Sequence, residues 1–187
     1  MSDTPWFIAV RPFGPSDGES WSSFVAWSGL SQLEEIVSLD GMLCEHVLDV
    51  AAFDAEDWKH NVDQDFVGAL CLDLEYLRRR VSSLGELNLL AAIRSPTPEC
   101  EQAFRDPRFR FQGYDLYEPD CGPSALTNCG GFPLAFRNAE LNRVGLLPTW
   151  SRAMEVQAAL RETYPDCEHG PWDVWALWRM EPRFVRA

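Results

Sequence analysis

The sequence predicts an α+β fold, a single domain in which several short helices pack on a mixed sheet. Strand-like and helix-like segments alternate along the 187 residues without the regular strand–helix–strand rhythm of a parallel α/β fold. Of these residues 46% are hydrophobic and 12% are aromatic, which is enough apolar material for one packed core. We therefore expect one globular domain over 1–187, with an acidic part (1–75) and a charge-balanced part (76–187).

The first part of the chain contains five expected elements. Residues 21–30 are aromatic and fit either a helix or a strand. Ser31 and Glu34 have the spacing of a capping box, and Asp54 precedes an acidic first turn, so both positions indicate helix starts. The expected elements are a strand over 5–13, a helix over 31–40, a short helix over 54–60, a buried strand or helical turn over 66–72, and a helix over 73–81.

The second part is more regular. Apolar and charged residues alternate from Arg108 onward, and the alternation changes phase at Gly113, which predicts a strand with a β-bulge at that glycine. Ser151 is the expected N-cap of a helix that Pro165 stops. The expected elements are strands over 86–94, 108–118 and 174–180, a helical piece over 100–104, a helix and turn over 132–147, and a helix over 151–164.

The tryptophans and cysteines are interpreted as core residues. Trp172, Trp175 and Trp178 recur every three residues, so on a strand they point to alternate faces and form no continuous stacking platform. The six cysteines are scattered over the chain, and Cys71 lies within an apolar run. We expect them to be buried thiols rather than disulfides. They are Cys44, Cys71, Cys100, Cys121, Cys129 and Cys167.

The formal charge of −13 is concentrated in the first part of the chain. Residues 1–75 contain fifteen Asp and Glu against Arg11 and Lys59, a balance of −13, whereas residues 76–187 contain fourteen Asp and Glu against fourteen Arg. The excess of acidic residues is densest over 49–75, where Lys59 is the one basic residue. The acidic residues there are Asp49, Asp54, Glu56, Asp57, Asp63, Asp65, Asp73 and Glu75.

This asymmetry indicates a docking surface for a basic protein, although a solvated acidic face that favours solubility gives the same composition. It argues against direct binding of nucleic acid, which requires clustered Lys and Arg. The leading hypothesis is a non-enzymatic inhibitor, such as an immunity protein that caps a toxin nuclease. The expected contact residues are Asp54, Glu56, Asp57, Asp63 and Asp65, with Trp58 as an aromatic anchor.

Two other classes remain open. The segment 121–133 places Cys129 before a Gly-Gly turn, so Cys129 is a candidate nucleophile of a hydrolase or transferase, although none of His46, His60 and His169 is identified as its base. The simpler interpretation is a tight glycine turn with a packed thiol.

The triplet Cys-Glu-His occurs at 44–46 and again at 167–169. If the two triplets met, they would supply the two cysteines and two histidines of a structural zinc site. The spacing within each triplet is unusual for zinc, and 123 positions separate them (167 − 44). The leading hypothesis therefore includes no cofactor and no metal.

The expected location is the cytoplasm. Residues 1–10 lack the basic region and apolar region of a secretory signal, and no apolar run approaches the ~20 residues that span a bilayer. Fifteen of the sixteen basic residues are arginine, which is typical of a GC-rich bacterial genome. A bacterial toxin–antitoxin setting is consistent with the inhibitor hypothesis.

Overall fold

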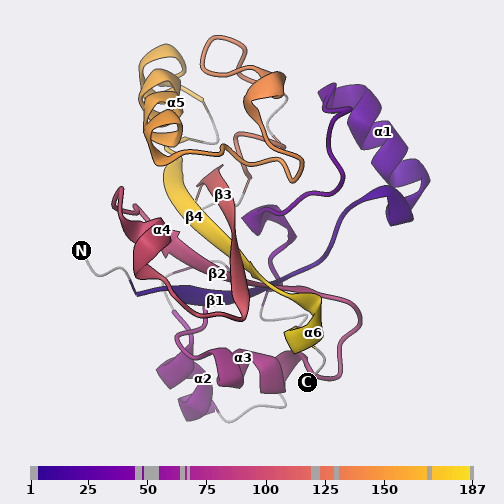
Figure 1. The fold of residues 1–187 in the computed structure, drawn as a ribbon, viewed down its shortest axis with the longest axis vertical. Helices are drawn as coiled ribbons and strands as arrows, with labels where there is room; N and C mark the ends of the chain where they lie inside the picture. The colour runs from indigo at the N-terminus through magenta and orange to yellow at the C-terminus, as the bar shows by residue number, and fades with distance from the viewer. Residues whose placement is uncertain are drawn as a thin grey trace.

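Four antiparallel strands form one sheet in the computed structural model, which describes residues 4–44, 48, 55–63, 66, 68–118, 123–128, 131–167 and 170–185. The strands are β1 (Trp6–Val10), β2 (Asn88–Arg94), β3 (Phe109–Tyr117) and β4 (Asp173–Met180), in the spatial order β1-β2-β4-β3 (Figure 1). The α+β fold class is confirmed, and the sheet is antiparallel in all three pairings rather than mixed.

The predicted bulge lies in β3. The pairing of β3 with β4 shifts register between Phe111 and Gly113, and Gly113 has a φ of 141°. Both backbone groups of Tyr114 bond to Leu147, with the Tyr114 amide 2.8 Å from the Leu147 carbonyl oxygen. The bulge therefore brings the 142–147 segment against the outer edge of β3.

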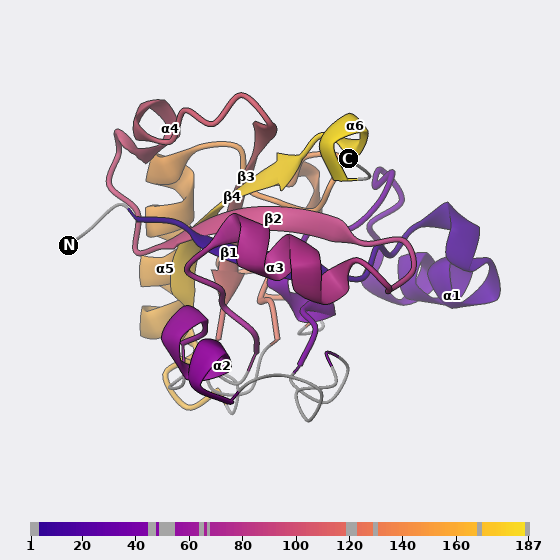
Figure 2. The same ribbon diagram turned by 90° about the horizontal axis from the view of Figure 1, so that it is seen from below.

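Short helices surround the sheet. Figure 1 shows α5 at one end of the molecule, α2 and α3 at the other, and α1 at the side, away from the sheet. From below, α3 crosses the sheet near β1, with α2 beside it (Figure 2). The helices are α1 (Glu19–Ser28), α2 (Ala55–Asn61), α3 (Leu74–Val81), α4 (Cys100–Ala103), α5 (Trp150–Thr163) and α6 (Pro182–Val185), with 3₁₀ turns η1 (Pro15–Asp17), η2 (Leu39–Gly41) and η4 (Asn138–Glu140).

Both faces of the sheet are buried, which confirms the interpretation of the three tryptophans. Trp175 belongs to one apolar cluster, with Ile8, Leu90 and Leu177, while Trp172 and Trp178 belong to the other. All three are at most 2% exposed. The strand period of two separates the faces, so the side chains from Val174 to Trp178 alternate between the two clusters.

Three expected elements differ from the structure. Residues 31–40 form no helix before η2, because their backbone bonds to distant segments: Ile36 donates to the Phe13 carbonyl and Val37 to that of Val144. Within 66–72, Cys71 forms isolated bridges to Phe7 and Val62, but the described residues form no strand or helix. Residues 132–147 contain η4 and turns in place of the expected helix.

Capping explains where two helices begin. The Asp73 side chain accepts from the Tyr76 amide at 2.6 Å, so α3 starts where the sequence predicts. The helix α5 begins earlier than expected, since Thr149 rather than Ser151 is its N-cap and accepts from the Arg152 amide. The ambiguous residues 21–30 belong mostly to α1, which ends at Gly29 in the left-handed conformation.

Candidate functional site

The helix α2 displays part of the predicted docking surface. The Glu56 side chain is 87% exposed and lies 3.5 Å from Lys59. Asp57, 43% exposed, forms an ion pair of 2.6 Å with Arg80 of α3 and also accepts from the Asn61 side chain. The acidic first turn of α2 is thus bound partly to the protein itself and partly open to solvent.

Of the other predicted contact residues, the structure describes Asp63 and Trp58. Asp63 follows α2, is half-buried, and its amide donates to the Leu70 carbonyl. Asp54 and Asp65 lie outside the described residues. Trp58 is 4% exposed and belongs to the larger apolar cluster, together with Val62 one helical turn later. Because its indole faces the core rather than solvent, Trp58 packs within the protein in this structure, and we do not include it in the proposed docking surface.

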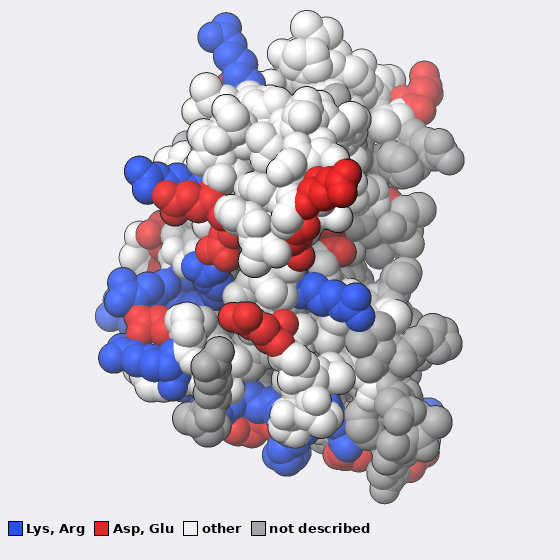
Figure 3. Space-filling view, turned by 90° about the vertical axis from the view of Figure 1, so that its right-hand side faces the viewer, with Lys and Arg blue, Asp and Glu red and all other residues white. Residues whose placement is uncertain are grey.

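The fold pairs the acidic part of the chain with arginines of the charge-balanced part. These ion pairs join Glu34 to Arg143, Glu35 to Arg179, Asp57 to Arg80, and Glu75 to Arg108. On the face shown in Figure 3, acidic and basic side chains alternate among the described residues and form no continuous acidic patch. The charge imbalance along the sequence is therefore partly offset in space, and the remaining excess is carried by acids outside these pairs.

Among the described residues, the cysteines form neither a disulfide nor part of a metal-binding cluster. Cys44, Cys71, Cys100 and Cys167 form no disulfide. Cys71 and Cys100 are buried as expected, whereas Cys44 and Cys167 are half-buried. Burial, followed by the charge of Asp73, raises the pKa of the Cys71 thiol to about 12, so this thiol stays protonated at neutral pH. Cys121 and Cys129 lie outside the described residues, as do the Glu and His of both Cys-Glu-His triplets. The described residues contain no cluster of three or more metal-binding side chains.

The structure also contains a feature that sequence analysis missed, a buried carboxylate cluster made of Ser38, Asp40, Asp115, Ser124 and Thr127. Asp115 of β3 is 0% exposed and lies opposite Trp175 in the sheet. Its oxygens accept from the Ser124 hydroxyl at 2.6 Å and from the Ser38 hydroxyl at 2.8 Å. The cluster therefore joins β3 to η2 and to the 123–128 segment.

Asp40 is the second carboxylate of this cluster. Its oxygens accept from the Ser124 amide at 2.6 Å and the Thr127 hydroxyl at 3.3 Å. Burial, followed by the charge of Asp115, raises the pKa of Asp40 to about 7. Burial also raises the pKa of Asp115, although the hydroxyls of Ser124 and Ser38 oppose this shift. Neither carboxylate lines the two cavities described next, so we interpret the cluster as structural.

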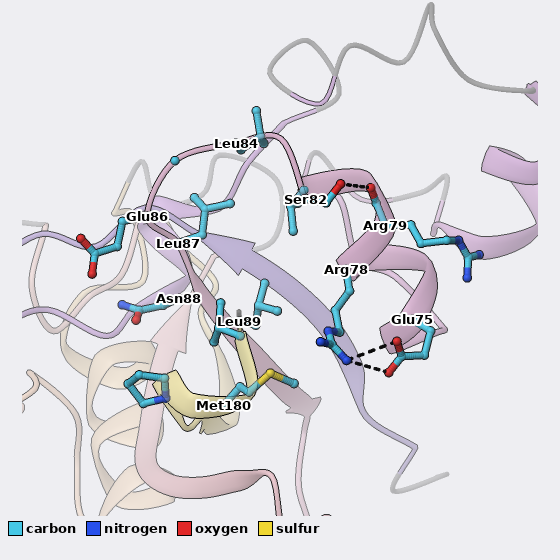
Figure 4. Close-up of a pocket in the computed structure, with 14 residues that line it drawn as sticks. Glu75, Arg78, Arg79, Ser82, Leu84, Glu86, Leu87, Asn88, Leu89 and Met180 are labelled. Carbon is cyan, nitrogen blue, oxygen red and sulfur yellow. Dashed lines mark hydrogen bonds and ion pairs between the residues drawn. The ribbon is translucent and has the colours of Figure 1, made fainter. Parts of the chain in front are cut away.

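Two cavities lie on either side of Met180 and Pro182. The larger, about 790 Å³, is bounded by α3, the 82–89 segment and α6. In Figure 4, Leu89 and Met180 lie at its base and Arg78 reaches from α3 to Glu75, while Arg79 points away. The smaller cavity, about 380 Å³, is lined by Arg110, Gln112, Arg179, Met180, Glu181, Pro182 and Arg183.

The comparisons with known proteins add no relative: the chain matches no family model, and neither a curated protein nor a solved structure is similar to it. Among the described residues, no helix has both the length and the apolar character needed to cross a membrane.

Proposed function

We propose that this protein is a non-enzymatic interaction module that docks on a basic protein through an acidic segment formed by α2 and its flanks. The acidic segment contains Asp54, Glu56, Asp57, Asp63 and Asp65. A toxin nuclease is the partner class that this charge fits best, because an active site that binds nucleic acid is cationic. In that setting the protein is an inhibitor of the immunity type.

The supporting observation is the density of carboxylates over 49–75. This stretch contains eight acidic residues and one basic residue, Lys59. Two of the acids, Asp57 and Glu75, form ion pairs with arginines from later in the chain. The Glu56 side chain is 87% exposed and forms an ion pair with Lys59 of the same helix. An ion pair at such exposure is worth well under ~1 kcal/mol, so a cationic partner displaces Lys59 at little cost.

Long-range attraction of this kind acts mainly on the association rate. Charges are screened beyond about 8 Å at physiological salt, so a docking patch works through acids that lie close together. Complementary patches raise the association rate at low salt and lose that advantage as salt is added.

The double variant Glu56→Gln with Asp63→Asn is expected to slow association with a basic probe protein by about five- to tenfold at low salt. The probe is immobilised pancreatic ribonuclease, and the measurement is surface plasmon resonance at several salt concentrations. The melting temperature is expected to stay unchanged or to rise, because two repelling charges are removed.

The matched control is Glu162→Gln with Asp166→Asn, which removes two exposed charges at the end of α5 and just beyond it. It is expected to change the association rate by less than about twofold, because these acids lie outside the acidic segment. Equal slowing by both double variants would show that net charge, and not the acidic segment, governs binding. That result would contradict the proposal.

A further inference from the structure

The smaller cavity gathers arginines in a chain whose net charge is strongly negative. Arg110, Arg179 and Arg183 line it together with Glu181. Adding Glu35, which pairs with Arg179, gives three positive and two negative charges, a local balance of +1 in a protein of −13. We call this space the arginine cavity.

A single carboxylate holds two of these arginines. Glu181 pairs with Nε of Arg110, and its other oxygen lies 2.7 Å from Nε of Arg183. The hydrogen bond from Arg110, and then the charges of both arginines, hold the pKa of Glu181 below its usual range. Glu181 is thus ionised at neutral pH and orients both guanidinium groups by their Nε edge.

This arrangement leaves the terminal nitrogens of both guanidinium groups available as hydrogen-bond donors, although one face of the Arg183 group lies 4.7 Å from the centroid of the Phe184 ring. Among the described residues they make no hydrogen bond, and the two side chains are 75% and 69% exposed. Guanidinium groups present planar pairs of N–H donors that match the oxygens of a phosphate. Arg179 adds a third cation from β4, directly opposite Arg110 in the sheet.

The wall of the arginine cavity is apolar on one side. Met180 and Pro182 line both cavities, and the larger cavity continues along Leu84, Leu87 and Val185. Figure 4 shows the larger cavity, with Leu84, Leu87, Leu89 and Met180 among the residues that line it. Met180 is only 1% exposed, so the accessible apolar surface of the arginine cavity is that of Pro182. Covering apolar surface of this kind contributes about 25 cal/mol per Å² to binding.

We propose that the arginine cavity binds the phosphate monoester group of a small molecule whose apolar body lies on Pro182. Three arginines suit a tetrahedral dianion, whereas one guanidinium is enough for a carboxylate. The size of the ligand follows from electrostatics: a long polyanion would be repelled by the rest of the protein, but a small dianion feels mainly the nearby arginines.

The alternative is a purely structural role, in which the same ion pairs attach α6 to β3. Calorimetric titration with phenyl phosphate at low salt separates the two possibilities. We expect phenyl phosphate to bind at least tenfold more tightly than benzoate, which carries the same ring with one negative charge. We also expect it to bind more tightly than inorganic phosphate, which lacks the apolar body. Absence of binding, or equal binding of benzoate, would overturn the phosphate site. Equal binding of inorganic phosphate would overturn the apolar contact.

Substitutions of single arginines test whether phenyl phosphate binds in the arginine cavity. Arg110→Gln and Arg183→Gln are each expected to weaken phenyl phosphate binding by at least fivefold. The control is Arg161→Gln, which changes a 54% exposed arginine that lies 3.8 Å from Asp173, and it is expected to alter affinity by less than twofold. A second readout is the shift of the arginine Nε–H resonances of the unmodified protein on titration. Equal loss in all three variants, or resonances that do not move, would contradict the assignment.

Discussion

Replacing Gly113 with alanine is expected to lower the free energy of unfolding by about 3 kcal/mol or more. A Cβ at this position would lie 2.7 Å from the Leu147 carbonyl oxygen and 2.8 Å from the Leu146 Cβ, and the φ of 141° is itself unfavourable for alanine. The carbonyl cannot withdraw without losing its hydrogen bond from the Tyr114 amide. Strain and steric overlap therefore add at the bulge.

Urea denaturation measures this change, and Gly85→Ala is its matched control. An added Cβ at Gly85 meets no atom within 4 Å, so the stability of that variant is expected to stay within about 0.5 kcal/mol of the unmodified protein. If Gly113→Ala fell within the same range as Gly85→Ala, the close approach of the 142–147 segment to β3 would be wrong.

Replacing Asp40 with asparagine is expected to stabilise the protein at pH 8 by about 2 kcal/mol. Asparagine keeps an oxygen for the Ser124 amide and removes the charge that lies near Asp115. The full difference between a pKa of about 7 and the ordinary 3.8 would give a larger value. We expect less because part of Asp40 remains exposed to solvent.

The sign of the pH dependence follows from the raised pKa. Between about pH 4 and pH 7 the folded protein holds a proton on Asp40 that the unfolded chain has lost, so stability falls as the pH rises through this window. Above pH 7 the penalty is complete, and below pH 4 it is absent. The stabilising effect of Asp40→Asn should therefore be large at pH 8 and close to zero at pH 4.

Denaturation of the unmodified protein and the variant at pH 4, 6 and 8 checks this expectation. Only their difference is used, so the titration of groups that do not interact with Asp40 cancels. Glu162→Gln on α5 makes the same change in net charge at an exposed position and should show no such dependence. A difference that is constant across the three pH values would mean that Asp40 ionises normally in the folded protein.

Local signals in the sequence predicted the elements whose causes are local. The acids at the start and bases at the end of α3, and the phase change at Gly113, are complete within a few residues. Residues 31–40 carry an equally good capping box, but their backbone groups find partners near Phe13 and Val144. Tertiary hydrogen bonds outweighed the weak helix preference of that segment.

The buried carboxylate cluster shows where sequence reasoning reaches its limit. Asp115 alternates with Tyr114 and Leu116, so the pattern predicts that it faces solvent on a strand with one buried face. The sheet is covered on both faces, and that fact depends on η2 and the 123–128 segment. One residue type hinted that this face is buried: Tyr117 lies two residues after Asp115 and so shares its face of the strand. In the structure Tyr117 is 5% exposed.

The spatial order of the strands limits when they can pair during synthesis of the chain. β2 and β3 both bond to β4, which is the last strand along the chain and lies between them. A ribosome must release residues 173–180 before these two strands gain a common neighbour, and until then the edge of each strand that pairs with β4 stays unpaired. Pairings between such distant segments make assembly slow, so a newly made chain is most exposed to aggregation in the interval before β4 is inserted between β2 and β3.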